Sequence, residues 1–72
     1  MDKEKFLVDL AEILEEDVVN ESDVLADFDA WDSLSILSIL SYVSEHYKVQ
    51  LKNDEVRAQK TVGDLANFIA SK

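Results

Sequence analysis

The chain has 72 residues, of which 16 are Asp or Glu and 7 are Lys or Arg, so its formal net charge is −9. The absence of Cys excludes disulfides, thiolate metal sites and protein-thiol chemistry, and the single His makes a His-based catalytic or metal site hard to build. So acidic a chain repels nucleic acid and anionic membranes, and no apolar run reaches the ~20 residues of a membrane-spanning helix. We therefore expect no nucleic acid partner and no membrane span. Because the N-terminus lacks the layout of a secretory signal, we expect a cytoplasmic protein, which we take to be a monomer.

The first predicted helix spans about residues 3–16, where apolar side chains recur at steps of three and four residues. Asp2 or Lys3 begins it, and it should fade in the acids at 15–17, because negative charge at a helix C-terminus opposes the helix dipole. Its apolar positions are Phe6, Leu7, Leu10, Ile13 and Leu14.

Residues 17–32 have no clear periodicity and predict a loop of about 15 residues. Loops of this length in a small domain are usually functional or disordered, and the apolar residues spread through this one argue against disorder. We expect those residues to hold the loop against the core: Val18, Val19, Val24, Leu25, Phe28 and Trp31.

A second helix is predicted from Asp32 to about Tyr47. Asp32 or Ser33 can cap it, since a short oxygen-bearing side chain accepts from the free N–H groups of the first turn. One wide apolar stripe is expected to face inward, formed by Ile36, Ile39, Leu40, Val43 and Tyr47.

Three serines, Ser35, Ser38 and Ser41, share another face of this second helix. Serine is only a middling helix former, and solvated helix faces usually carry Lys and Glu. The uncharged face therefore suggests close contact with a partner protein, helped by Leu34 and Leu37.

Residues 48–53 are expected to be extended or turning, before a short helical turn over 54–59 that Asn53 or Asp54 caps. A last helix is predicted from about Thr61 to Ser71, in which Thr61 and Asp64 form a capping box. Its inward-facing residues are Val62, Leu65, Ala66, Phe68 and Ile69. Three main helices and one short helix, with the long loop between the first two, predict an all-α four-helix bundle, with residues 1–72 as a single domain.

Asp32-Ser33-Leu34 is the strongest candidate site, because it lies where the acidic loop meets the N-terminus of the most apolar helix. Free N–H groups and the positive end of the dipole favour an attached phosphate at such a position. An exposed serine there can carry a phosphate-linked group at low electrostatic cost, and Asp32 can cap the helix or contact a modifying enzyme and its metal. As a three-residue pattern alone, the motif is weak.

With these elements in place, the chain resembles an acyl carrier protein over essentially its whole length. The resemblance rests on Asp32-Ser33-Leu34 about halfway along, preceded by Trp31, on the spacing of the helices, and on the ending Thr61-Val62-Gly63-Asp64-Leu65 with Phe68-Ile69. It implies that a phosphopantetheinyl transferase recognises Asp32 and Leu34 and attaches 4′-phosphopantetheine from coenzyme A to Ser33. It also implies a free-standing carrier that catalyses nothing itself. Its arm would hold acyl groups as thioesters for acyl-transferring and condensing enzymes of fatty acid, polyketide or related lipid biosynthesis.

Three positions depart from the family's pattern. Ala30 stands where a glycine usually lies two residues before the aspartate, which suggests a different turn, held by Trp31. Ser35 and Ser38 replace acids that usually dock on basic patches of partner enzymes, which weakens the case for the standard fatty acid synthesis partners. The short third helix carries Arg57 and is less acidic than usual. None of these positions touches the attachment chemistry.

Residues 1–33 hold 12 acids and 2 bases, net −10, whereas residues 34–72 hold 4 acids and 5 bases, net +1. Electrostatic docking should therefore depend on the loop acids more than on the serine face; these acids are Glu21, Asp23, Asp27 and Asp29. The predicted docking residues are Asp27, Asp29, Trp31, Ser35, Leu37, Ser38 and Ser41, although Trp31, like Phe28, is better explained as an anchor of the loop. The residues that would line the acyl-chain space, or simply fill the core, are Phe28, Ile36, Leu40, Val43, Val62 and Phe68.

Other interpretations fit these residues less well. Asp27 and Asp29 do not begin an EF-hand loop, because the fifth and sixth positions from Asp27 are Trp31 and another aspartate, so no metal site is predicted. Ser33 and His46 lie 13 residues apart on one helix, which is ~20 Å, so they cannot form a catalytic pair and no catalytic residue is predicted. An acidic helical interaction module without a prosthetic group and an aminoacyl or peptidyl carrier remain as alternatives.

Overall fold

The structure is a computed structural model that describes residues 2–72. Within this range every regular element is helical, apart from one isolated antiparallel bridge between Val24 and Thr61. The elements in chain order are α1 (Lys3–Ile13), the 3-10 turn η1 (Leu25–Asp27), α2 (Ser33–Tyr47), α3 (Asn53–Arg57) and α4 (Val62–Ala70). The predicted all-α bundle of three main helices and one short helix is confirmed.

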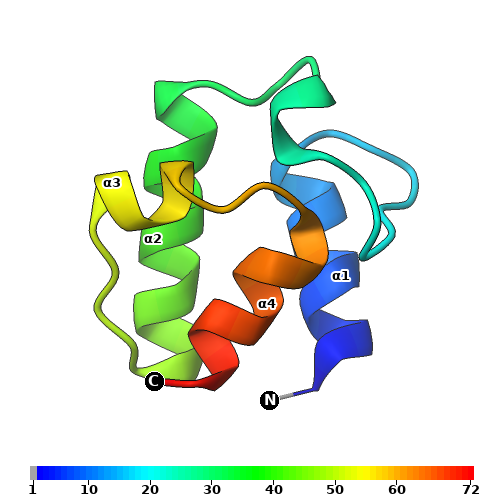
Figure 1. Cartoon of the computed structure of the whole chain (residues 1–72). Helices are drawn as coiled ribbons and strands as arrows, with labels where there is room; N and C mark the ends of the chain where they lie inside the picture. Colours follow the sequence, from blue (N-terminus) through cyan, green and yellow to red (C-terminus); the bar gives the residue numbers. More distant parts are fainter. Residues whose placement is uncertain (1) are drawn as a thin grey trace.

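Figure 1 shows α1 and α2 running in opposite directions, with α4 between them and α3 beside α2. Each of the three main helices turns its apolar stripe toward the others, because this is the arrangement that removes most apolar surface from water. The stripe predicted on α2 is confirmed, with Leu40 and Tyr47 at its half-buried edge. The deepest side chains of the core are Phe6, Leu10, Leu14, Leu25, Ile36, Ile39, Val43, Val56, Val62 and Leu65. Among the described residues, no helix combines the length and the apolar character that crossing a membrane requires.

The end of α1 differs from the prediction, because the helix stops at Ile13 instead of continuing to about residue 16. Glu15 adopts a left-handed conformation with φ of 59°. The N–H of Glu16 donates to the carbonyl of Ala11 at 2.8 Å, and the N–H of Glu15 donates to that of Glu12 at 3.2 Å. These two bonds form a Schellman motif, which satisfies the last carbonyls of the helix and turns the chain away.

The loop from residue 14 to residue 32 is held against the bundle, as predicted. Val19 and Leu25 are buried, and Phe28 and Trp31 are half-buried against the core. Val18 is the exception, since it is 68% exposed and anchors nothing. The loop also contains the turn η1, which the sequence analysis missed because three residues are too few to show a period.

Backbone bonds tie this loop to the start of α4. The N–H of Val62 donates to the carbonyl of Asp23 at 2.9 Å, and the N–H of Gly63 donates to that of Glu21 at 2.8 Å. A Cβ on Gly63 would lie 3.1 Å from the carbonyl oxygen of Glu21. The only glycine of the chain therefore stands where the loop and the helix approach most closely.

The cap of α4 agrees with the sequence prediction, whereas the cap of α3 differs from it. Thr61 caps α4, its hydroxyl accepting from the N–H of Asp64 at 3.1 Å while the Asp64 carboxylate accepts from the N–H of Thr61 at 3.3 Å. The short helix α3 begins one residue earlier than predicted, and Lys52 is its N-cap rather than Asn53 or Asp54. The Glu55 carboxylate accepts from the Lys52 N–H at 2.9 Å, which is the half of a capping box that the third helical residue supplies.

Candidate functional site

Ser33 is the first residue of α2, and its side chain is exposed. Asp32 is the N-cap, and its carboxylate accepts from the N–H of Ser35 at 3.0 Å. The Ser35 hydroxyl in turn accepts from the Asp32 N–H and donates to the Asp32 carbonyl oxygen, both at 3.0 Å. These bonds fix the turn before the helix and leave the Ser33 hydroxyl open to solvent, as the sequence predicts.

The first turn of α2 suits a negatively charged group on Ser33. The N–H groups of Asp32 and Ser35 are used by the capping box, whereas those of Ser33 and Leu34 have no acceptor within residues 2–72. Two free N–H groups and the positive end of a 15-residue helix therefore lie beside the Ser33 hydroxyl. A phosphate attached there would receive hydrogen bonds and a favourable field.

Arg57 is a neighbour of Ser33 that the sequence analysis did not place in the site. It ends α3, and its Nη2 donates to the Ser33 Oγ at 3.2 Å. Its Nε donates to the Asn53 Oδ1 at 2.5 Å, which orients the guanidinium group along the short helix. The only signal in the sequence was the unusual base in this position, and 24 residues separate it from Ser33.

The predicted serine face is only partly correct. Ser35 is 7% exposed, and its hydroxyl is used by the capping box, so Ser35 cannot present that hydroxyl to a partner protein. Ser38 and Ser41 are exposed, as expected. Both line an open groove of about 450 Å³ between α1 and α2, whose other lining residues are Lys5, Asp9, Glu12, Ile13, Tyr42, Glu45 and His46.

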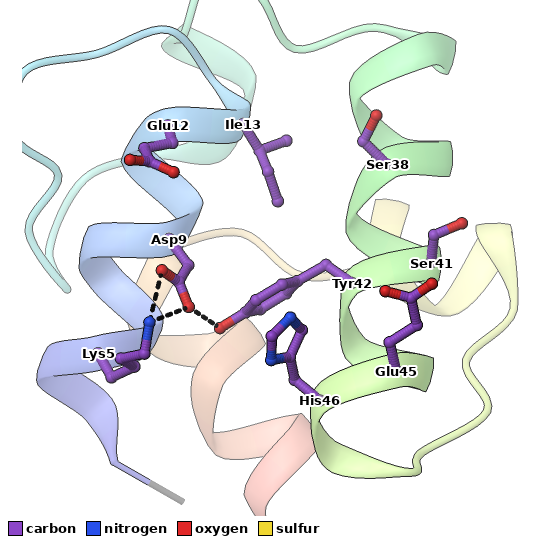
Figure 2. Close-up of a pocket in the computed structure, with 9 residues that line it drawn as sticks. All are labelled: Lys5, Asp9, Glu12, Ile13, Ser38, Ser41, Tyr42, Glu45 and His46. Carbon is purple, nitrogen blue, oxygen red and sulfur yellow. Dashed lines mark hydrogen bonds and ion pairs between the residues drawn. The ribbon is translucent and has the colours of Figure 1, made fainter.

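Figure 2 shows the polar network in this groove. The Tyr42 hydroxyl donates to the Asp9 carboxylate at 2.5 Å, and Lys5 pairs with the same carboxylate at 3.1 Å. The hydrogen bond from Tyr42 holds the pKa of Asp9 below its usual value. Burial, reinforced by the bond to Asp9, raises the pKa of Tyr42. The network joins α1 to α2, and a Tyr42–Tyr47 hydroxyl contact of 3.0 Å extends it.

Two large apolar side chains stand exposed on α2 next to the attachment candidate. Leu34 is 75% exposed and Leu37 is 54% exposed. Trp31 and Phe28 differ from them, because both are half-buried against the core, so their anchoring of the loop is confirmed. Three of the residues named for the acyl-chain space are fully buried: Ile36, Val43 and Val62. Phe28 and Leu40 are half-buried against the core, and Phe68 is half-buried on α4.

An acidic hollow of about 440 Å³ lies beside Asp32. Its acids are all exposed, whereas two other acids of the loop, Glu21 and Asp23, are engaged elsewhere. The Asp23 carboxylate accepts from the N–H of Asn20 at 2.8 Å, and Glu21 pairs with Lys3 at 3.5 Å. The lining residues of the hollow are Leu14, Glu15, Glu16, Asp29, Ala30 and Asp32. None of these has a left-handed backbone except Glu15, so Ala30 stands in a turn that needs no glycine.

The alternative chemistries find no support in the geometry. Within residues 2–72, no three His, Asp or Glu side chains are grouped closely enough to hold a metal ion. Ser33 begins α2, whereas His46 lies in its last turn and stacks on Tyr42 with ring centroids 4.6 Å apart. The two ends of one straight helix cannot meet, so Ser33 and His46 form no catalytic pair.

The fold and the exposed serine agree with comparisons to known proteins. The sequence pattern of the family described as "Phosphopantetheine attachment site" matches residues 4–69. This chain belongs to that family of phosphopantetheine-binding carrier proteins, which includes the acyl carrier proteins. Carriers of this kind are not catalysts, so the chain is not an enzyme, and its cofactor is a covalently attached phosphopantetheine.

Among its relatives are two bacterial acyl carrier proteins. That of Acidothermus cellulolyticus is 37% identical over 78 positions, which cover 99% of this chain and 92% of the relative. That of Tropheryma whipplei is 30% identical and covers 96% of this chain and 92% of the relative. The solution structure of a holo acyl carrier protein from Geobacter metallireducens superposes with a TM-score of 0.76 at 30% identity, covering 96% of this chain and 82% of that one.

Proposed function

We propose that Ser33 carries the 4′-phosphopantetheine group and that the protein holds acyl groups as thioesters on the thiol of this arm. In the attachment step, the Ser33 Oγ forms a phosphodiester bond with the phosphate next to pantetheine in coenzyme A. The pyrophosphate bond of coenzyme A breaks, adenosine bisphosphate leaves, and the hydroxyl proton is released. The observation that carries the proposal is the exposed Ser33 hydroxyl beside two free N–H groups in a chain of this family.

The residues of the chain position the group rather than react with its cargo. Asp32 holds the turn through its bond to the Ser35 N–H, so Ser33 projects from the first turn of α2. Leu34, which is 75% exposed, is available to the phosphopantetheinyl transferase as an apolar contact. The thiol itself comes with the arm, which agrees with a chain that has no Cys.

Partner enzymes are proposed to dock on the surface around Ser33. Exposed Leu37 offers an apolar contact on α2, with the small hydroxyls of Ser38 and Ser41 alongside. Asp29 and the hollow beside Asp32 offer negative charge to a basic patch. Asp27 is exposed as well, and the exposed part of Trp31 completes the predicted surface.

The carried chain is proposed to shelter among the helices. Phe28 and Leu40 lie at the half-buried edge of the core, where side chains can move aside more easily than in its centre. Phe68 is half-buried on α4. Ile36, Val43 and Val62 are fully buried and would contact a chain that enters more deeply.

The partners that this function requires are a phosphopantetheinyl transferase and the acyl-transferring and condensing enzymes of fatty acid, polyketide or related lipid biosynthesis. We propose that residues 1–72 act as one monomeric domain in the cytoplasm. Acyl cargo is preferred over aminoacyl or peptidyl cargo, because the relatives are acyl carrier proteins. An interaction module without a prosthetic group is not supported in a chain of this family.

Intact mass after co-expression with a phosphopantetheinyl transferase tests the attachment. The wild-type chain should gain the mass of one phosphopantetheine group, and Ser33→Ala should gain none while keeping its helical circular dichroism. Ser44→Ala is the matched control, since it removes a serine of the same helix outside the proposed docking surface, and it should be loaded like the wild type. Loading of Ser33→Ala, or no loading of the wild type by several transferases, would refute the proposal.

A further inference from the structure

We propose that Arg57 binds the phosphate of the group attached to Ser33 and thereby directs the arm toward α3. The inference deepens the proposed function and rests on attachment at Ser33. It assigns a ligand contact to a residue outside the Asp32-Ser33-Leu34 motif, on a different helix and 24 residues away in the chain.

The guanidinium group of Arg57 is already aimed at the attachment atom. Its Nη2 lies 3.2 Å from the Ser33 Oγ, and the bond from its Nε to Asn53 keeps the planar group in that direction. Attachment converts this Oγ into a phosphodiester oxygen and places next to it two non-bridging oxygens that share one negative charge. The same N–H groups that now reach a neutral hydroxyl would then reach an anion.

The charge of Arg57 has no other use in the structure. It is the only arginine of a chain with 16 acids. Yet among residues 2–72 it takes part in none of the ion pairs, which join Lys3, Lys5 and Lys72 to carboxylates. Both acceptors that it reaches, the Asn53 amide oxygen and the Ser33 hydroxyl, are neutral. A guanidinium group next to a serine thus keeps its charge available for a phosphate.

Arginine suits this role by its geometry. Its planar fork donates several N–H bonds and binds phosphate oxygens in pairs, with bonds roughly twice as strong as those between neutral groups. The Nη1 and Nη2 groups remain available after Nε has bound Asn53. On the side of α2, the free N–H groups of Ser33 and Leu34 would complete the binding of the phosphate.

One consequence is that loading would steady α3. This helix has only five residues, and Val56 is its one fully buried side chain. An isolated helix of this length is not stable by itself. A bond between Arg57 and a phosphate anchored on α2 would add a second attachment and tie α3 to the start of α2.

The test combines loading with substitution of Arg57. Wild type, Arg57→Gln and Arg57→Lys are each prepared without and with the phosphopantetheine group, and intact mass verifies the state. Lys60→Gln is the matched control, because it removes one exposed positive charge that does not contact Ser33. For each variant, urea unfolding is measured in both states, and the phosphorus NMR signal of the phosphodiester is recorded at low and high salt.

Loading should increase the equilibrium ratio of folded to unfolded protein. This increase should be about two- to fivefold larger in the wild type than in Arg57→Gln. Lys60→Gln should behave like the wild type, and Arg57→Lys should be intermediate. The phosphorus signal should differ from that of the wild type in Arg57→Gln and not in Lys60→Gln, and the difference should shrink at high salt. Comparing the two states of one variant removes any effect of the substitution on the unmodified fold.

Equal effects of loading in Arg57→Gln and Lys60→Gln, with the same phosphorus signal, would overturn the inference while leaving attachment at Ser33 intact. Loss of loading in Arg57→Gln alone would also overturn it, because Arg57 would then act on the transferase. If the wild type itself is never loaded, the proposed function fails instead. Intact mass shows which variants are loaded, and therefore separates failure of the proposed function from failure of the inference about Arg57.

Discussion

Ser33 owes its accessibility to the capping box that closes around it. Asp32 caps α2 through the Ser35 N–H, and Ser35 closes the box, so both of these side chains are committed to the turn. A capping side chain of this kind contributes about 1 kcal/mol to stability. Asp32 therefore has a structural role in addition to any recognition by a transferase, and substitutions at this position change both.

The residue pair Asp9 and Tyr42 predicts a pH dependence. The bond from Tyr42 lowers the pKa of Asp9 in the folded protein. The stability that this bond contributes is therefore fully present above the unfolded pKa of about 4, and it is lost as the pH falls through the lower, folded pKa. Tyr42→Phe should cost about 1.5 kcal/mol at pH 7, because Asp9 loses its hydroxyl donor. The difference in unfolding free energy between the wild type and Tyr42→Phe should narrow between about pH 5 and pH 2, as Asp9 becomes protonated.

Urea unfolding followed by circular dichroism at several pH values measures this gap. Tyr47→Phe is the control, because the Tyr47 hydroxyl contacts Tyr42 but not Asp9. Its cost should vary much less with pH. A gap for Tyr42→Phe that stays constant from pH 7 to pH 3 would contradict the assignment.

At the scale of elements, the helix ends decide where the loops begin. α1 stops at Ile13 because Glu15 turns into the left-handed region and closes a Schellman motif. Glycine usually takes this position, since a side chain there costs about 1–2 kcal/mol. The early stop releases Glu15 and Glu16 to line the acidic hollow near Ser33.

Glu15→Gly should therefore stabilise the protein by about 0.5–1 kcal/mol, after allowing for the greater freedom of glycine in the unfolded chain. Glu15→Ala separates the two causes, because it removes the charge at the helix C-terminus but keeps the backbone strain. Its gain should be smaller, and Glu16→Gly should bring no gain. Denaturation midpoints measure the stability of all three variants. If Glu15→Ala stabilises the protein as much as Glu15→Gly does, backbone strain is ruled out as the cause.

At the scale of the whole molecule, the charge of −9 is unevenly presented around the site. Asp23 and Glu21 are occupied within the loop, whereas Asp27 and Asp29 are exposed and make no side-chain bond within residues 2–72. The loop acids predicted to guide docking are therefore not equivalent. The two nearest Ser33 in sequence remain available to a basic partner.

The double variant Asp27→Asn/Asp29→Asn should slow loading by a transferase about two- to tenfold at low salt and much less at 0.5 M salt, because the field of the surface speeds encounter. Glu4→Gln/Asp54→Asn is the matched control, since it removes the same two charges at other exposed positions. Loading rates at both salt concentrations provide the measurement. Equal slowing in the two double variants would point to net charge instead of a local surface.

Much of this protein follows from neighbours within four residues of each other in the sequence. The periodic apolar positions of α2 and α4, the Thr61–Asp64 box and the capping oxygen of Asp32 are all local, because a helix and its caps form within one or two turns. The four-helix bundle could be predicted for the same reason, whereas the choice of Ser33 also needed the resemblance of the whole chain to a known family. The end of α1 was predicted two to three residues late, because nothing in the local pattern requires Glu15 to adopt a positive φ.

Only the tertiary structure decided which side chains meet across the bundle. The burial of Ser35 depends on its packing beneath the turn, and the approach of Gly63 to Glu21 depends on how the loop lies on α4. The contact between Arg57 and Ser33 joins residues 24 apart through the packing of α3 on α2. The sequence by itself determined the main helices, the caps of α2 and α4 and the exposed serine, because these need only local bonds and an apolar period. The surroundings of that serine were decided by packing, because contacts between distant residues form only when the core brings the helices together.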